Sequence, residues 1–273
     1  MLHYLGYIAA IFIGLSLGIM GGGGSILTVP VLVYLIGVSP VLSTAYSLFV
    51  VGSTSLVGAL GYFRKGLVAV PTALVFLATS LVSVFLTRKF VMPAIPHALF
   101  TVGGLLVTKD LLVLVAFAVL MVVAATSMIR SRQAEVVLDA ELHQPAHGIN
   151  YPLILAVGAV VGGLTGFVGA GGGFLIIPAL VLFARLPMKL AVGTSLAIIA
   201  VNSLIGFGGD LSAGTPIAWP FLLGFLAFAL AGIVGGTYLA RFIPGQKLKP
   251  AFGWFTLAMG GFILTKELLF HHG

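Results

Sequence analysis

Two glycine runs lie inside long apolar stretches, where glycine has no evident packing role. The first reads GGGGSILTVP over residues 21–30, and the second reads GAGGGFLIIP over residues 169–178. Because glycine is costly in a helix, each run predicts a helix that breaks and then starts again. A restarting helix presents unpaired backbone N–H groups and the positive end of its dipole, both of which favour negative charge. The two runs therefore predict a site for one small anion.

Small polar side chains near the runs could complete the shell around such an anion. Ser47 and Thr54 are seven residues apart and share a helix face, and Ser195 and Asn202 repeat this spacing in the second half. Each of these side chains alone is more simply explained by contacts between packed helices. As matched pairs beside matched glycine runs they favour a binding site. The predicted site comprises Gly22, Gly23, Gly24, Ser25, Ser47, Thr54, Gly171, Gly172, Gly173, Thr194, Ser195 and Asn202.

The composition restricts the class of protein. Of 273 residues, 60% are hydrophobic and 7% are charged, and the mean hydropathy is +1.24. A soluble domain carries about 25% charged residues, so the chain is predicted to be an all-α, multi-pass membrane protein. It contains no cysteine and no tight histidine cluster, so neither a metal, nor a cofactor, nor catalysis by a thiol is expected. The net charge of +7 suits the lipid bilayer and a small anion as partners, and no nucleic acid is expected.

The chain is an internal repeat. At an offset of 148 residues, sixteen of the 49 positions from Gly18 to Gly66 are identical, including several glycines, Pro30/Pro178 and Ser47/Ser195. The predicted organisation is a first repeat with one additional helix over residues 1–129, a charged linker over 130–150 and a second repeat over 151–273.

About nine membrane spans are predicted, among them 68–86, 96–108 and 111–128, if each glycine-broken segment crosses once. Five spans then precede the second half, which makes the halves inverted-topology repeats. No charged residue is expected near the middle of a span, since Arg88 and Lys89 close the span 68–86. A weak excess of Lys and Arg favours a cytoplasmic N-terminus. Each broken segment has about 33 residues, more than the roughly 20 of one span, so hairpins that turn back remain an alternative.

The doubled motif resembles the sulfite exporter TauE/SafE family of membrane transporters over essentially the whole chain. The residues that carry the resemblance are Gly21-x-Gly23-Gly24-x-x-Leu27-x-x-Pro30, Ala45-x-Ser47-Leu48, Gly58-x-x-x-Tyr62-x-Arg64-x-Gly66, and in the second copy Gly169 to Pro178, Gly193-Thr194-Ser195-Leu196 and Asn202-Ser203. The resemblance implies transport of small sulfur-containing anions, such as sulfite or an organosulfonate like sulfoacetate, across the cytoplasmic (inner) membrane. The second copy departs from the first where Asp210 replaces Tyr62.

Other readings stay open at this point. The chain could be a permease for another small solute, including a cation held by unwound backbone carbonyls. An intramembrane hydrolase using Ser47 or Ser195 with His97 is disfavoured because the glycine-flanked nucleophile motif is missing, so no enzyme activity is expected. A scaffold without transport would leave the duplicated glycine runs unexplained, and a homodimer remains open.

Overall fold

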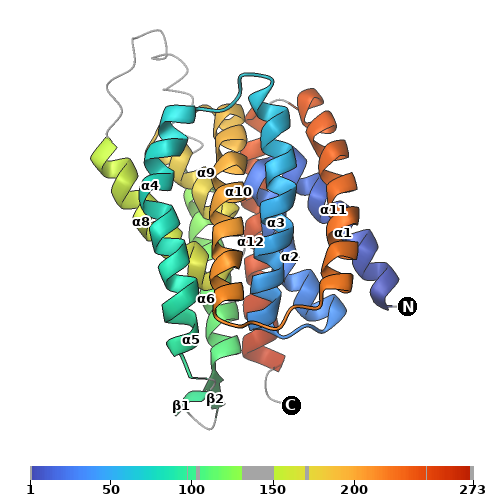
Figure 1. The fold of residues 1–273 in the computed structure, drawn as a ribbon. Coiled ribbons are helices and arrows are strands. Elements are labelled where there is room, and N and C mark those ends of the chain that lie inside the picture. The colour runs from blue at the N-terminus through green and yellow to red at the C-terminus, as the bar shows by residue number, and fades with distance from the viewer. Residues whose placement is uncertain are drawn as a thin grey trace.

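The computed structural model describes residues 2–96, 98–102, 105–130, 151–169, 172–243 and 245–270. Nearly all of the predicted linker 130–150, together with His97 and Gly171, lies outside these residues. The described chain is helical apart from one short pair of strands (Figure 1).

The first half contains α1 (Leu2–Met20), the 3-10 segment η1 (Gly21–Gly24), α2 (Ser25–Pro30), the π-helical segment η2 (Val31–Ile36), α3 (Pro40–Phe63), α4 (Val70–Leu86), the π-helical segment η3 (Thr87–Val91), α5 (Met92–Ala94), β1 (Ala98–Val102), β2 (Leu105–Thr108) and α6 (Lys109–Arg130). The second half contains α8 (Tyr151–Val168), α9 (Gly173–Leu182), α10 (Met188–Ser212), α11 (Trp219–Leu239), the 3-10 segment η4 (Ala240–Phe242) and α12 (Gly245–Phe270).

Prolines and glycines explain several helix boundaries. Proline lies in the first turn of α3, α4 and α11, where the missing N–H group has no partner to lose. The loops after α3 and α10 turn at Gly66 and Gly214, whose φ angles of 69° and 79° favour glycine.

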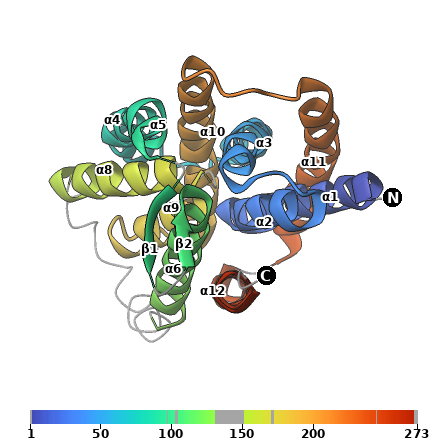
Figure 2. The ribbon, with the colours of Figure 1, turned by 90° about the horizontal axis from the view of Figure 1, so that it is seen from below.

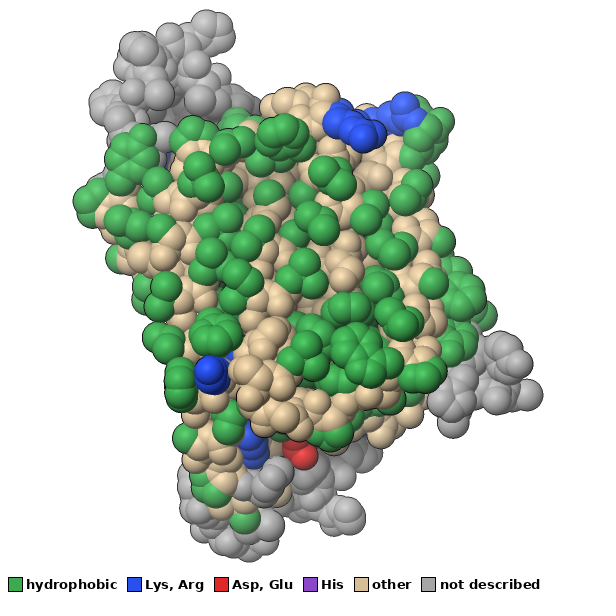
Figure 3. All heavy atoms as spheres, in the orientation of Figure 1, with side chains coloured by type: hydrophobic (Ala, Val, Ile, Leu, Met, Phe, Trp, Pro, Cys, Tyr) green, Lys and Arg blue, Asp and Glu red, His purple; other side chains and the backbone are tan. Residues whose placement is uncertain are grey.

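Six helices are long and apolar enough to cross a membrane. They span Pro40–Phe63, Val70–Ala94, Lys109–Thr126, Tyr151–Val168, Met188–Ser212 and Trp219–Phe242. Figure 3 shows a broad hydrophobic surface with Lys and Arg side chains towards its two ends, as expected for a chain that lies in a bilayer.

At each glycine run the chain turns back instead of continuing across. In the first half, the backbone at Gly24 packs on Ile13 and Leu17, and Gly6 faces the side chain of Ile36, so α1 and the α2–η2 segment lie antiparallel. We call residues 2–36 the first hairpin, and residues 151–182, which contain α8 and α9, the second hairpin. Positive φ angles at Gly21, Gly169 and Gly172 make the sharp bends possible. The alternative of hairpins that turn back is therefore confirmed over the single broken span.

The hairpins point in opposite directions. The first hairpin rises from the lower right of Figure 1, and the second descends from the upper left. Seen from below, α1 and α8 lie across the bundle, while α3 and α10 stand between them (Figure 2). Among the six long helices, α3 and α10 have the largest buried share, so they form the centre of the molecule.

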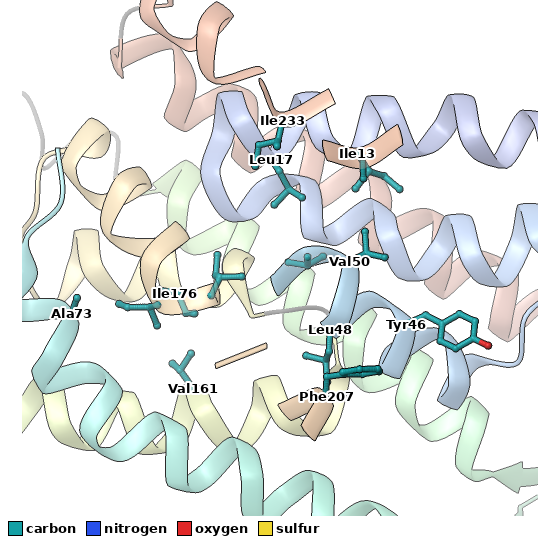
Figure 4. Packing of buried hydrophobic residues seen from close by; sticks show 14 of the residues in the cluster. Ile13, Leu17, Tyr46, Leu48, Val50, Ala73, Val161, Ile176, Phe207 and Ile233 are labelled. Atoms are coloured by element: carbon teal, nitrogen blue, oxygen red, sulfur yellow. The ribbon is translucent and has the colours of Figure 1, made fainter. Parts of the chain in front are cut away.

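Close packing joins each hairpin to a neighbouring helix. α1 packs on α11, α8 packs on α4, and α6 packs on α12. Gly14 and Gly18 of α1 allow this close packing, because a Cβ at either position would overlap the backbone of α11. Figure 4 shows the hydrophobic core, in which Ile13 and Leu17 of α1 lie near Ile233, and Leu48 of α3 lies near Phe207 of α10.

Two predicted spans are corrected. Residues 96–108 do not form a helix: β1 and β2 pair antiparallel there, with Val102 opposite Leu105. The segment is too short to span, and the Gly-Gly pair at 103–104 between two apolar runs is a hairpin signal that the apolar composition obscured. The span predicted to end at residue 86 continues through η3 to Ala94. Arg88 therefore lies inside the helix and not after its end.

Candidate functional site

The tips of the two hairpins meet at the centre of the molecule. Gly22 and Gly173 are in backbone contact, so a Cβ added to either residue would overlap the backbone of the other. A Cβ at Gly21 would lie 3.1 Å from Oγ of Ser195 and 3.0 Å from Val192 of α10. The structure thus brings together two segments that are about half a chain apart in sequence, and only glycine fits at the contact.

Most of the predicted hydroxyls at this centre bond to nearby backbone. Ser25 donates to the carbonyl of Gly22 at 2.6 Å, Ser195 to that of Val192 at 2.8 Å, and Thr54 to that of Val50 at 2.7 Å. The hydroxyl of Ser47, by contrast, is fully buried and has no partner among the described residues. Gly24 and Gly172 also lie at the tips. Only the backbone of Gly23 is described, and Gly171 lies outside the described residues.

Two predicted residues are engaged in contacts between elements. The backbone N–H of Ala69 donates to Oγ1 of Thr194 at 2.9 Å, which ties the loop after α3 to α10. Asn202 exchanges hydrogen bonds of 3.0 and 3.1 Å with Ser80 of α4. These contacts match the helix-packing role that each polar side chain could have by itself.

Several buried polar atoms lack a partner in the described part of the chain. They are the hydroxyls of Thr28, Ser47, Ser55, Thr165 and Ser203, and Nε and Nη2 of Arg88. Ser55 and Ser203 are equivalent positions of the repeat, and Thr165 lies against Gly172 at the tip of the second hairpin. Buried polar groups are nearly always paired, so the unpaired atoms of Thr165 and Arg88, which lie beside the second glycine run, indicate a place where a ligand could supply the partners.

Arg88 is a residue that sequence reasoning missed. Its side chain is 1% exposed, and Nη1 donates to Oγ1 of Thr44 at 3.0 Å and lies 3.4 Å from Oδ2 of Asp210. A Cβ on Gly169 would overlap Nη2, so the guanidinium lies directly against the second glycine run. The prediction that Arg88 closes the span was therefore wrong, because the apolar run ends before the helix does. The sequence did contain one indication of a buried cation, because the second repeat has Asp210, the partner of Arg88, where the first has Tyr62.

The end of the bundle that holds the loop after α3 has a basic cavity of about 160 Å³. Its lining includes Lys65, Lys189 and Arg241, with no acidic residue, and it reaches Val192, which contacts Gly21. Tyr62, which is equivalent to Asp210 in the repeat, also lines this cavity and donates to the carbonyl of Gly18 at 3.2 Å. The cavity could therefore attract an anion towards the first glycine run.

A second cavity, of about 430 Å³, lies beside the loop after the first hairpin and is lined mainly by apolar residues, among them Leu42, Tyr46 and Phe221. Within the described ranges, no cluster of His, Asp or Glu side chains could hold a metal ion.

Comparison with known proteins now identifies the chain. The model of the family described as "Sulfite exporter TauE/SafE" matches residues 6–263. The chain belongs to this family. It is 29% identical over 258 residues to a probable membrane transporter protein of Xylella fastidiosa (strain 9a5c), covering 93% of this chain and 92% of the relative.

A second relative is the probable membrane transporter protein YunE of Bacillus subtilis (strain 168), which is 26% identical over 242 residues, with 84% of this chain and 86% of the relative covered. No solved structure matches the chain significantly. The family description and the names of these relatives are those of membrane transporters, which agrees with the predicted membrane class.

Proposed function

We propose that the protein transports a small sulfur-containing anion, sulfite or an organosulfonate such as sulfoacetate, across the cytoplasmic membrane. The anion would bind where the tips of the two hairpins meet. The observation that carries this proposal is the backbone contact between Gly22 and Gly173, with the unpaired hydroxyl of Thr165 against Gly172 at the same tip. The family description supports the choice of a sulfur-containing anion.

The chemistry of the centre favours an anion over a cation. Backbone N–H groups at the helix starts and the hydroxyls of Ser47 and Thr165 can all donate to oxyanion oxygens. The buried guanidinium of Arg88, beside Gly169, would repel a cation. A permease that binds a cation through backbone carbonyls is therefore the weaker candidate.

We further propose that the two halves are inverted repeats that rock against each other around the central site. The hairpins enter from opposite ends of the bundle, and the loop after α3 lies at the opposite end from the loop after α10 (Figure 1). Matching contacts support the equivalence, since α1 packs on α11 as α8 packs on α4. Inverted repeats with broken helices at their interface suit alternating access.

The hairpins also change the proposed orientation. Among the described residues, the end that holds the loop after α3 carries eight Lys or Arg: Arg64, Lys65, Arg130, Arg185, Lys189, Arg241, Lys247 and Lys249. The other end carries three, Lys89, Lys109 and Lys266, apart from the buried Arg88. The positive-inside rule places the first end in the cytoplasm. The N-terminus, at the other end, would then be extracytoplasmic, in place of the cytoplasmic position that the count for single crossings favoured.

Substitutions that add a side chain at the hairpin tips test the proposed function. Gly22→Ala and Gly173→Ala each place a methyl group against the other tip, whereas Gly208→Ala on α10 places it in open space and serves as the control. In proteoliposomes, we expect saturable uptake of radiolabelled sulfite or sulfoacetate by the wild type and the control, and at least about a tenfold loss in both tip variants. Absence of uptake of either anion by the wild type would contradict the proposed substrate, and full uptake by the tip variants would contradict the proposed site.

A further inference from the structure

The Arg88–Asp210 pair joins η3 to α10 in the buried interior, directly beside the second glycine run. Arg88 is the largest side chain in the described chain with less than 2% exposure, and Asp210 is 6% exposed. Placing two charged groups in such a position is costly unless their contacts are good. The quality of the contacts therefore indicates whether the pair serves the fold alone.

The geometry of the pair is poor for a structural ion pair. Only Nη1 of Arg88 approaches the carboxylate, at 3.4 and 3.5 Å from its two oxygens, while Nε and Nη2 have no partner in the described residues. A strong arginine–carboxylate pair is bidentate, with N···O distances of about 2.7–2.9 Å. Two donors of Arg88 are thus unpaired, and Nη2 occupies the space that a Cβ on Gly169 would take.

We propose that Arg88 is the cationic group that binds the transported anion, and that Asp210 neutralises Arg88 while the site is empty. This assignment rests on the proposed transport of a small sulfur-containing anion. Nε and Nη2 form the planar fork that suits two oxygens of a sulfite or sulfonate group, with the hydroxyl of Thr44 close by. The bound anion replaces Asp210 as the partner of Arg88.

The exchange has a structural consequence for the helices that carry the pair. With no anion bound, Arg88 of η3 is held to Asp210 of α10 and to Thr44 of α3, so three helical segments are tied together beside the tip of the second hairpin. An anion that takes over the guanidinium releases Asp210 and weakens the tie between η3 and α10. Binding thereby favours the separation of these segments, which a transporter needs in order to open at that end.

Substitutions of Asp210 and of Arg88 should change the sulfite affinity in opposite directions, which a purely structural ion pair would not do. Because Asp210 competes with the anion, Asp210→Asn is expected to tighten sulfite binding by about tenfold or more. Arg88→Gln is expected to weaken it by roughly 30-fold or more, and Arg88→Lys to restore it in part, since lysine keeps the charge and loses the fork. Binding is measured from the concentration dependence of thermal stabilisation by sulfite in detergent, with sulfoacetate as a second probe.

The double variant Arg88→Gln/Asp210→Asn separates loss of binding from loss of folding, because it removes both charges of the pair and leaves neither one unpaired. It is expected to melt near the wild-type temperature and to bind sulfite as weakly as Arg88→Gln. Lys89→Gln is the matched control, since Lys89 is the next residue of η3 and its ammonium group lies over the rings of Phe85 and Phe90.

Two results would be decisive against the assignment, and they differ in scope. Wild-type sulfite binding in the folded double variant overturns the role of Arg88 and leaves the proposed transport intact. Wild-type protein that neither binds nor transports sulfite or sulfoacetate overturns the proposed function, and the role of Arg88 with it.

Discussion

At the scale of single residues, a buried hydroxyl with no partner opposes folding, so its presence calls for a reason. Ser47 and Ser80 are both fully buried, yet Ser80 is paired with Asn202 and Ser47 has no partner in the described chain. A structural serine and a ligand-binding serine respond differently to removal of the hydroxyl. Loss of a paired group leaves its partner unsatisfied, whereas loss of an unpaired group removes a cost.

We therefore expect Ser47→Ala to keep or raise the melting temperature while it reduces anion uptake severalfold through a higher KM. Ser80→Ala should do the reverse: it leaves the amide of Asn202 without its partner and lowers stability by about 1 kcal/mol, with uptake at saturating anion retained. Thermal unfolding and sulfite uptake measured on the same preparations give both quantities. A Ser47→Ala protein that loses stability but transports normally would show that this hydroxyl is structural.

At the scale of helices, glycines set how closely each hairpin approaches its neighbour. On α11, a Cβ at Gly232 or Gly236 would overlap backbone carbonyls of α1, and on α8, a Cβ at Gly162 would lie 2.6 Å from the carbonyl of Ser80 on α4. Small residues at membrane-helix interfaces allow such approach, and dispersion contacts then hold the helices together. The hairpin tips depend on this packing for their position at the centre.

A bulky residue at this interface should displace the first hairpin. We expect Gly232→Leu to lower stability by about 3 kcal/mol and to abolish uptake, because the side chain cannot fit against the carbonyl of Ile11. Gly235→Leu lies on the same helix with open space around its Cβ, so stability and uptake should stay near wild type. Equal melting temperatures for the two variants in detergent would contradict the packing described here.

The apolar composition was sufficient to predict the helical membrane class, and the two glycine runs marked the places where the chain bends. The sequence left open whether each run breaks a span or turns the chain back, since that depends on contacts such as Gly6 with Ile36. Arg88 was missed because its burial comes from α3 and α10, which are distant in sequence. The strands β1 and β2 were missed because apolar composition alone does not separate strand from helix over such a short segment.

At the scale of the whole molecule, the hairpins determine which loops share a side of the membrane. Since the first hairpin returns to its starting end, the N-terminus should lie on the same side as Ser39 and Ala213, and opposite to Arg64 and Arg185. The chain contains no cysteine, so single cysteines can be introduced without background.

We expect a membrane-impermeant maleimide to label an N-terminal cysteine tag, Ser39→Cys and Ala213→Cys in intact cells. Arg64→Cys and Arg185→Cys should react only after the cells are opened, because the basic loops are cytoplasmic in the proposed orientation. Labelling of the tag together with Arg64→Cys, and not with Ser39→Cys, would instead support a first segment that crosses once.

The difference between Tyr62 and Asp210 bears on the energetics of the resting protein. In a transporter built from two identical inverted repeats, a two-fold rotation would relate the outward-facing and inward-facing conformations, and both would be equally populated without substrate. Here one end is tied by a charged pair and the other by a tyrosine hydrogen bond, so the two conformations cannot have the same free energy. The difference between Tyr62 and Asp210 would therefore contribute to a preference of the unloaded protein for one of the two conformations.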